Sequence, residues 1–476
     1  MAMSVALAHA LPEAILFVGA LLLVLIGAIR GEKSAPLVAE LAMAVLTLAG
    51  VAIVVSSKRH GEVFDGAFID DGFARFMKML VLVGSLGSLV LSRDYLRREG
   101  IDQFEYPILI LLSTLGMLML TSANNLLALY LGLELMSLAL YVVAAFHRDN
   151  VKASEAGLKY FVLGALSSGM LLYGASLIYG YTGTLSFHGI AAALKSGPNV
   201  GVIFGLVFLM AGLAFKMSTV PFHMWTPDVY EGAPTPVTAF FASAPKMAAV
   251  AITARVVMSA FPGIVHEWRQ IVVFISIASM AVGSFAAIGQ QNIKRLMAYS
   301  SIGHMGFALV ALAAGSEMGV RGLAVYVAIY LVMTLGVFAA ILHMRVNGKA
   351  VENISDLSGL SRTNGWLAFA LAMLMFSLAG VPPLAGFFAK YYAFLAAVQA
   401  GLFPLAVIGV LLSAVAAYYY LRIVKIMYFD APAPAFDPAP FSVRAVLALS
   451  TALVFLFWIY PAPIVEAAGA AARALF

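Results

Sequence analysis

Six residues that can carry a proton lie inside the long apolar runs of this sequence, away from its charged loops. They are Glu134, Lys159, Lys216, Lys246, Lys390 and His304. A charge at the centre of a membrane helix costs about 2.5–3.5 kcal/mol on insertion scales, so such residues usually face the interior of a helix bundle and mark ion or proton paths. Amines and a carboxylate in these surroundings indicate a chain that moves protons.

The competing interpretation is a static set of ion pairs that fixes helix packing. A static set should balance its charges, whereas this one has an excess of lysine, and we therefore favour proton transfer. Burial disfavours a charged amine and a nearby carboxylate restores the charge, so Lys216 is expected to release its proton when such a pair separates. Lysine suits this task because arginine stays charged. Lys159 lies near a helix start, where its stem can reach the surface, and is expected to be structural.

Polar residues extend two of these positions into helix faces. One set, around Glu134, recurs at i, i+4, i+7 and i+11, and a second set surrounds Lys246. The members are Tyr130, Glu134, Ser137 and Tyr141 in the first set, and Thr238, Lys246 and Thr253 in the second. Each face predicts a chain of hydrogen-bonded side chains or water, although ordinary hydrogen bonding between helices would give the same pattern.

Two apolar runs contain helix breakers beside a lysine. Pro221 follows Lys216 and cannot donate a hydrogen bond to the carbonyl of Met217, so the helix must open there. A second break lies at Gly380–Pro383, with Lys390 one to two turns beyond it. Paired interrupted helices in corresponding halves of a transporter indicate its ion site, whereas a simple proline kink is the alternative for either break alone. The layout suggests an inverted repeat.

The elements that position these residues must lie in a membrane. Hydrophobic residues make up 63% of the 476 positions and charged ones 11%, whereas a soluble protein carries about 25% charged residues. About fourteen apolar runs are long enough to span a bilayer, and they must be helices because lipid offers no partner to an open backbone group. We predict an all-α integral membrane protein with a single polytopic domain, residues 1–476. The basic residues form no stripe with interleaved aromatics, which argues against nucleic acid binding.

Lysine and arginine are unevenly divided between the loops. Numbered from the first helix, the odd loops hold about fifteen, and the even loops with the C-terminus hold about five, including Lys58 and Arg59. Four more lie near the outer helix ends: Arg75, Lys78, Arg255 and Arg269. Basic loops face the cytoplasm, so both termini are expected on the periplasmic side of a bacterial inner membrane.

The sequence has no cysteine, which excludes disulfides, iron–sulfur clusters and thiolate metal sites within this chain. Its eight histidines are scattered without metal-ligand spacing, and no phosphate-binding or dinucleotide-binding motif appears. Any redox chemistry must therefore belong to a partner.

Five segments resemble the antiporter-like membrane subunits of the proton-pumping NADH:quinone oxidoreductase, respiratory complex I. They are Asn124–Leu138, Lys216–Asp228, Ala244–Lys246, Gln291–Ser301 and Pro382–Lys390. The resemblance covers nearly the whole chain, and the stretch His223–Pro236 is highly specific. Within this family the chain is most similar to the subunit N group, the counterpart of mitochondrial subunit 2, partly because Lys390 stands where a sister subunit has glutamate.

The resemblance implies about fourteen transmembrane helices, with two inverted five-helix repeats that contain discontinuous helices. The repeats would occupy residues 105–260 and 266–428, between N-terminal helices in residues 1–104 and a C-terminal helix in residues 429–476. It also implies a set of proton-handling residues. These are Glu134, Lys216, Lys246 and Lys390, with His223 and His304 as further candidates.

The function implied is that of a proton-translocating enzyme subunit that couples quinone reduction by NADH to pumping. No cofactor is expected in this chain, whereas NADH, FMN, iron–sulfur clusters and quinone would bind to partner subunits. The expected partners are the antiporter-like and small membrane subunits of the membrane arm, and membrane lipid. Two alternatives stay open, namely a subunit of an Mrp-type sodium/proton antiporter and the membrane anchor of a hydrogenase-like complex.

Overall fold

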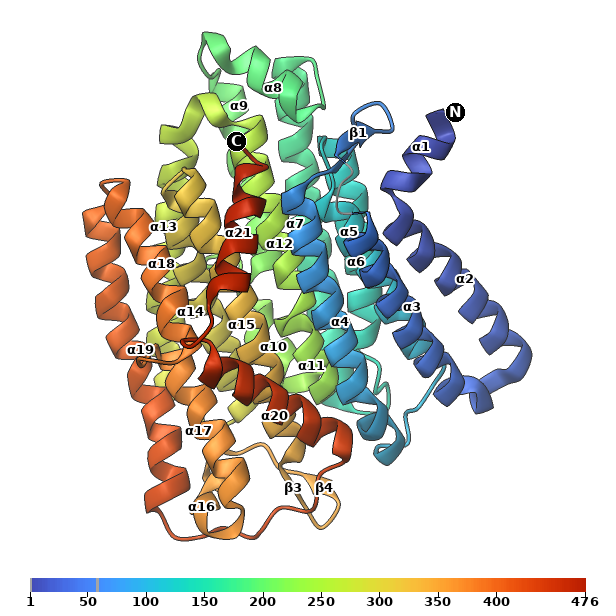
Figure 1. The fold of residues 1–476 in the computed structure, drawn as a ribbon, viewed down its shortest axis with the longest axis vertical. Helices are drawn as coiled ribbons and strands as arrows, with labels where there is room; N and C mark the ends of the chain where they lie inside the picture. Colours follow the sequence, from blue (N-terminus) through green and yellow to red (C-terminus); the bar gives the residue numbers. More distant parts are fainter. Residues whose placement is uncertain (1, 57–59) are drawn as a thin grey trace.

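Long apolar helices dominate the computed structural model, which describes residues 2–56 and 60–476 (Figure 1). Lys58 and Arg59, which enter the loop count above, lie outside those residues. The only strands in the described part form two short antiparallel hairpins. The expected all-α membrane architecture is therefore confirmed.

The N-terminal helices contain two long helices that run antiparallel to each other and are joined by a short 3-10 turn, Gly31–Ser34 (Figure 1). The carboxylate of Asp71 begins the last helix of this part by accepting a hydrogen bond from the backbone N–H of Ala74 at 2.7 Å. The elements are α1 Ala2–His9, α2 Leu11–Arg30, α3 Ala35–Val55, β1 Gly61–Val63, β2 Phe68–Asp70 and α4 Gly72–Arg98.

The next group of helices holds the first break and a second interruption near Ser243. Its first long pair, α5 and α6, packs closely before the chain turns into α7. The elements are α5 Glu105–Thr121, α6 Leu126–Ala144, α7 Val151–Thr182, α8 Phe187–Ala193, α9 Val200–Met217, α10 Trp225–Gly232, α11 Thr235–Ala242 and α12 Ala244–Arg255, which continues as a π-helical turn to Ala260.

The third group holds the second break, and the chain then closes with two helices that together cross the front of the molecule in Figure 1. The C-terminal helix packs against both α4 and the long central helix of the third group. The elements are α13 Val265–Ile288, α14 Ile293–Ala313, α15 Glu317–His343, β3 Arg345–Val346, β4 Lys349–Ala350, α16 Leu360–Thr363, α17 Gly365–Ala379, α18 Ala385–Gln399, α19 Phe403–Phe429, α20 Phe441–Leu456 and α21 Ala462–Arg473.

Ten helical segments in the described residues are long and apolar enough to cross a membrane. The first of them, Leu11–Val55, contains the antiparallel pair α2 and α3, and three shorter apolar helices, α5, α17 and α20, accompany the ten. Large apolar side chains are exposed on the outer helices, such as Leu22 at 54% and Phe204 at 60%, as expected where lipid is the solvent. The number fourteen itself stays a prediction.

The same backbone pairing occurs once in each of the two later groups. Leu126 N–H donates to the carbonyl of Leu185 at 3.0 Å, and Ile293 N–H donates to the carbonyl of Glu352 at 2.8 Å. Both residue numbers of the first pair rise by 167 to give the second pair (126 to 293, 185 to 352). The first pairing lies beside α8 and the second beside the β3–β4 hairpin, at opposite ends of the bundle (Figure 1). This supports two repeats of opposite orientation.

One expectation about a helix face is wrong. The run from Thr235 is interrupted at Ser243, because Pro245 cannot donate to the carbonyl of Phe241 four residues earlier. Thr238 therefore does not share a face with Lys246, and its hydroxyl donates to the carbonyl of Tyr230 at 3.0 Å.

Candidate functional site

The structure buries the three lysines and the histidine that the sequence places inside helices. Lys216 is 4% exposed, Lys246 1%, Lys390 6% and His304 3%. A buried ammonium is costly unless polar groups surround it. The contacts of each side chain therefore show what the fold provides for it.

The first break lies directly after Lys216. The helix α9 ends at Met217 because Ser218 takes a left-handed backbone conformation with φ of 62°. The ammonium of Lys216 donates a hydrogen bond to the hydroxyl of Tyr141 at 3.2 Å. Its Nζ also lies 5.1, 5.4 and 5.6 Å from the ring centres of Tyr141, Phe215 and Tyr160, so three aromatic faces surround the cation.

Glu134 lies on α6, the helix that also carries Tyr141. Within the described residues its carboxylate forms no ion pair with Lys216, whose ammonium donates to Tyr141 instead. Its Oε1 is buried and has no hydrogen-bond partner there. In the predicted face around Glu134, Tyr141 reaches Lys216, whereas Ser137 donates back to the carbonyl of Leu133. The site thus holds a carboxylate and an amine on two helices that meet through Tyr141, and the two groups are not paired with each other.

Lys246 reaches the first break from another helix. Its Nζ donates to the carbonyl of Met217 at 3.3 Å, and this is the carbonyl that Pro221 leaves without a helical partner. The hydroxyl of Thr253, two turns along the same helix, points to the sulfur of Met217 at 3.7 Å. The break therefore brings Lys216 and Lys246 to one stretch of open backbone.

The second break lies between α17 and α18. Pro383 leaves the carbonyl of Ala379 without its helical donor, and the Nζ of Lys390 donates to that carbonyl at 2.8 Å. Lys390 also donates to the hydroxyl of Ser413 at 2.7 Å and lies 4.7 Å from the ring centre of Phe307. A cavity of about 630 Å³ between α17, α18 and α19 reaches this ammonium.

His304 lies on α14, one turn before Phe307, whose ring faces Lys390 at the second break. Both ring nitrogens form hydrogen bonds, Nδ1 with the hydroxyl of Tyr326 at 2.7 Å and Nε2 with that of Tyr420 at 3.1 Å. An imidazole with a hydroxyl on each side can accept a proton at one nitrogen and donate one from the other.

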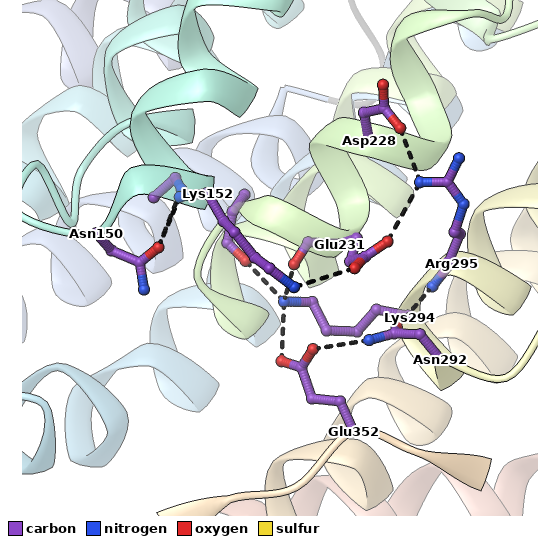
Figure 2. A network of polar contacts seen from close by, with 10 residues as sticks. Asn150, Lys152, Asp228, Glu231, Asn292, Lys294, Arg295 and Glu352 are labelled. Carbon is purple, nitrogen blue, oxygen red and sulfur yellow. Dashed lines mark hydrogen bonds and ion pairs between the residues drawn. The ribbon is translucent and has the colours of Figure 1, made fainter.

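Lys159 belongs to a network of ion pairs at one end of the bundle. Its Nζ contacts the carboxylates of Glu155 and Asp228, both at 2.7 Å, rather than extending alone to the surface. Arg295 contacts the other oxygen of Asp228 at 2.7 Å. Burial raises the pKa of Asp228, but the hydrogen bonds and charges of Lys159 and Arg295 outweigh it and hold that pKa below its ordinary value. Figure 2 shows Asp228 and Arg295 facing each other, together with the neighbouring Lys152, Glu231, Lys294 and Glu352.

Comparison with known proteins identifies the family. The chain matches the family described as "NADH:quinone oxidoreductase/Mrp antiporter, TM" over residues 123–416. It is 71% identical to NADH-quinone oxidoreductase subunit N of Beijerinckia indica over 99% of both chains. The chain belongs to the NADH-quinone oxidoreductase subunit N family.

Solved structures share the fold of this chain. A chain of respiratory complex I from Thermus thermophilus, with bound aureothin, is 33% identical, covers 96% of this chain and 99% of its own, and superposes with a TM-score of 0.83. A chain of the Mrp complex from Dietzia sp. superposes with a TM-score of 0.87 over 98% and 97% of the two chains, but at 22% identity. The Mrp likeness therefore shows a shared fold and no more.

His223 lies apart from the lysines of this subunit N member. It is half-buried in the segment between α9 and α10, and its Nδ1 has no hydrogen-bond partner in the described part of the chain. Among those residues its side chain forms no hydrogen bond or ion pair with a buried lysine or glutamate. The structure does not bring it into the group formed by the other candidates.

Sequence reasoning missed the tyrosines around His304. Tyr326 and Tyr330 lie one turn apart on α15, and Tyr330 pairs with the hydroxyl of Ser301 at 2.6 Å. Two tyrosines at i and i+4 inside an apolar run were the available signal, because a buried phenol requires a hydrogen-bond partner. Their proximity to His304 could not be read from the sequence, since it depends on how α14, α15 and α19 pack.

The structure corrects the interpretation of the basic residues near the outer helix ends. Three of them are buried in ion pairs and are not surface charges that report orientation. The pairs are Arg75 with Asp70 at 2.9 Å, Lys78 with Glu13 at 2.6 Å, and Arg255 with Asp71 at 2.8 Å. Burial raises the pKa of Asp71, but the guanidinium of Arg255 holds it below its ordinary value. A count of basic residues cannot reveal such partners.

Proposed function

We propose that this chain carries protons across the membrane along Glu134, Lys216, Lys246, His304 and Lys390. It does so as subunit N of an NADH:quinone oxidoreductase, whose family membership is established above. The observation that supports the path is the use of both helix breaks. Each proline leaves one carbonyl without its helical donor, and in each case a buried lysine ammonium donates to that carbonyl.

The proposed transfer begins at Glu134 and Lys216. A carboxylate that approaches Lys216 favours its charged form, and separation of the two favours release of the proton. Lys246 lies on the other side of the same break, hydrogen-bonded to the carbonyl of Met217, and is the next acceptor. Water that enters the break would complete the transfer, because Lys216 and Lys246 are not hydrogen-bonded to each other in the described residues.

The path continues through His304 to Lys390. The hydroxyls of Tyr326 and Tyr420 on either side of the imidazole provide donors and acceptors for this step. Moving one charge against 100 mV takes about 2.3 kcal/mol, so energy must come from outside this chain. We propose that it comes from quinone reduction by NADH in partner subunits that bind FMN, iron–sulfur clusters and quinone.

We also propose how the chain divides into repeats, how it is oriented in the membrane and which subunits surround it. The repeats are assigned to residues 105–260 and 266–428, and the bundle is placed in a bacterial inner membrane with both termini periplasmic. The other antiporter-like and small membrane subunits are the proposed neighbours within the membrane arm. His223 is retained only as a peripheral candidate.

The test uses the assembled complex in sealed membrane vesicles. Lys216→Ala and Glu134→Ala are expected to abolish quinone-linked proton pumping while assembly persists. Lys349→Ala, an exposed lysine on the β3–β4 hairpin, is the control and should pump normally. Wild-type pumping by assembled Lys216→Ala complex would support a purely structural membrane anchor instead.

A further inference from the structure

The half-helix α10 is one of the elements through which the first break contacts the third group of helices. It follows directly on the open backbone after Lys216, and its first residue holds it to the last turn of α9. The indole N–H of Trp225 donates to the carbonyl of Phe215 at 3.0 Å. A shift of α10 would therefore change the surroundings of Lys216.

The acids of α10 are held from two directions. Asp228 contacts Lys159 of α7 through one oxygen and Arg295 of α14 through the other, both at 2.7 Å. Glu231 contacts Lys152 of α7 at 3.3 Å and Arg295 at 3.2 Å. Figure 2 shows Arg295 facing both carboxylates from its own helix. Helices α7 and α14, which belong to two different groups of helices, thus both form ion pairs with the same half-helix.

Lys294 holds the other end of α10. Its ammonium donates to the carbonyls of Glu231 and Ala233, each at 2.8 Å, and contacts Glu352 at 3.1 Å. The side chain is 3% exposed, so water cannot easily replace these contacts. Lys294 lies on α14, ten residues before His304, or about 15 Å along the helix.

The charges of this network balance, unlike those of the proposed proton path. We call the network the α10 clasp. Its bases are Lys152, Lys159, Lys294 and Arg295, and its acids are Glu155, Asp228, Glu231 and Glu352. A neutral, mutually paired set is suited to holding elements in one arrangement, and offers no excess charge for a separate ion.

We propose that Asp228 and Lys294 are positioning residues that fix α10 between the two groups of helices. With α10 fixed in this position, the proton path through the break at Lys216 and along the helix of His304 cannot open to both sides of the membrane at once. The inference rests on the proposed proton path. Alternating access requires such a constraint, because a path open at both ends dissipates the gradient that it is meant to build.

The experiment measures passive proton leak in the absence of NADH. The whole complex is reconstituted into vesicles, a pH gradient is imposed, and its decay is followed with a trapped pH indicator. Asp228→Asn and Lys294→Met should each speed the decay several-fold relative to wild type. The matched control is Glu40→Gln, because this acid also pairs with a base of another helix, Arg93 at 2.6 Å, but belongs neither to the clasp nor to the proposed proton path. It should leave the decay unchanged.

A second substitution separates positioning from damage. The leak of Asp228→Asn should disappear in the double variant Asp228→Asn with Lys246→Ala, because the leak must use the path through the first break. A leak that persists in the double variant would overturn the proposal, and so would tight vesicles with both single variants. The clasp can fail in this way while Lys216→Ala still abolishes NADH-driven pumping, so its failure differs from failure of the proposed function.

Discussion

The two helix breaks share a backbone design but use different side chains. Each has a left-handed residue three positions before its proline, Ser218 before Pro221 and Gly380 before Pro383. Each proline leaves one carbonyl open to a lysine ammonium. In the second break that ammonium belongs to Lys390, seven residues after the proline on the same broken helix. The first break takes its lysine from a different helix.

The position that Lys390 occupies is held by Asp228 in the first break, also seven residues after the proline (221 to 228, 383 to 390). This acid does not turn toward the open carbonyl and pairs instead with Lys159 and Arg295. A carbonyl freed by a proline is thus common to both breaks. The lysine that donates to it lies on the broken helix itself in the case of Lys390, and on a different helix in the case of Lys246. The same position holds a proposed proton carrier in one break and a residue of the α10 clasp in the other.

The largest effect should come from replacing lysine by arginine at the open carbonyls. Lys246→Arg and Lys390→Arg keep the positive charge and a donor, but arginine does not release its proton. The rate of NADH-driven proton pumping should fall more than tenfold in each variant, about 1.4 kcal/mol or more of added barrier. The rate is measured in vesicles with assembled complex. Normal pumping by either variant would mean that its break only anchors a charge.

A second large effect tests whether the repeats pack equivalently. Gly116 and Gly283 occupy matching positions (116 to 283, a rise of 167), and an added Cβ would lie 2.3 Å from Met136 N and 2.5 Å from Gly303 N, respectively. Each Gly→Ala change should destabilise the subunit by about 1–3 kcal/mol, because backbone at such distances must shift.

The measurement for this pair is the midpoint of thermal dissociation of the complex in detergent. Gly169→Ala is the control, because its added Cβ meets nothing within 4 Å and a helical alanine is favoured over glycine. A large loss at Gly116 with none at Gly283 would contradict the equivalence of the two repeats.

Sequence reasoning could predict the residues and the breaks but not their partners. Burial of Lys216 and Lys390 followed from their position in apolar runs, and proline chemistry located two breaks. The interruption at Ser243 was missed because Pro245 lies at the start of α12, where proline is well tolerated. The apolar pattern continues through this interruption, and the prediction therefore placed Thr238 on the wrong helix face.

Long-range pairing explains the remaining misses. Lys78 and Glu13 are 65 positions apart in the chain, and Arg255 and Asp71 are 184 apart. A buried ion pair and a surface charge near a helix end look alike when each residue is considered alone. The α10 clasp was hidden for the same reason, since Lys294 and Arg295 resemble ordinary basic residues of a cytoplasmic loop.

A smaller effect should separate the hydrogen bonds of the two breaks. Tyr141→Phe removes the one side-chain hydrogen bond that Lys216 makes in the described residues, whereas Ser413→Ala leaves Lys390 its bond to the carbonyl of Ala379. A hydrogen bond to a charged group contributes about 1.5–3 kcal/mol. Turnover should fall about tenfold in Tyr141→Phe and less in Ser413→Ala, as NADH-driven pumping rates would show. Equal losses would mean that Lys390 does not rely on the open carbonyl.

The smallest effect concerns the pH dependence of stability that comes from Asp228, the acid seven residues after the proline of the first break. Because the paired bases lower the pKa of Asp228 in the folded protein, its stabilisation is fully present above the ordinary carboxyl pKa of about 3.9. The contribution is lost as the pH falls through the lowered folded value.

Stability from Asp228 should therefore be constant between pH 5 and 8 and decline only in stronger acid. Asp228→Asn lacks this titration, so its dissociation midpoint should differ from wild type by a constant amount at neutral pH and converge with it below about pH 4. Midpoints are compared across the series by thermal dissociation in detergent. A difference that changes between pH 6 and 8 would show that Asp228 is not held ionised by its bases. In that case the acid would resemble the proposed proton carriers, and the contrast between the two breaks would be lost.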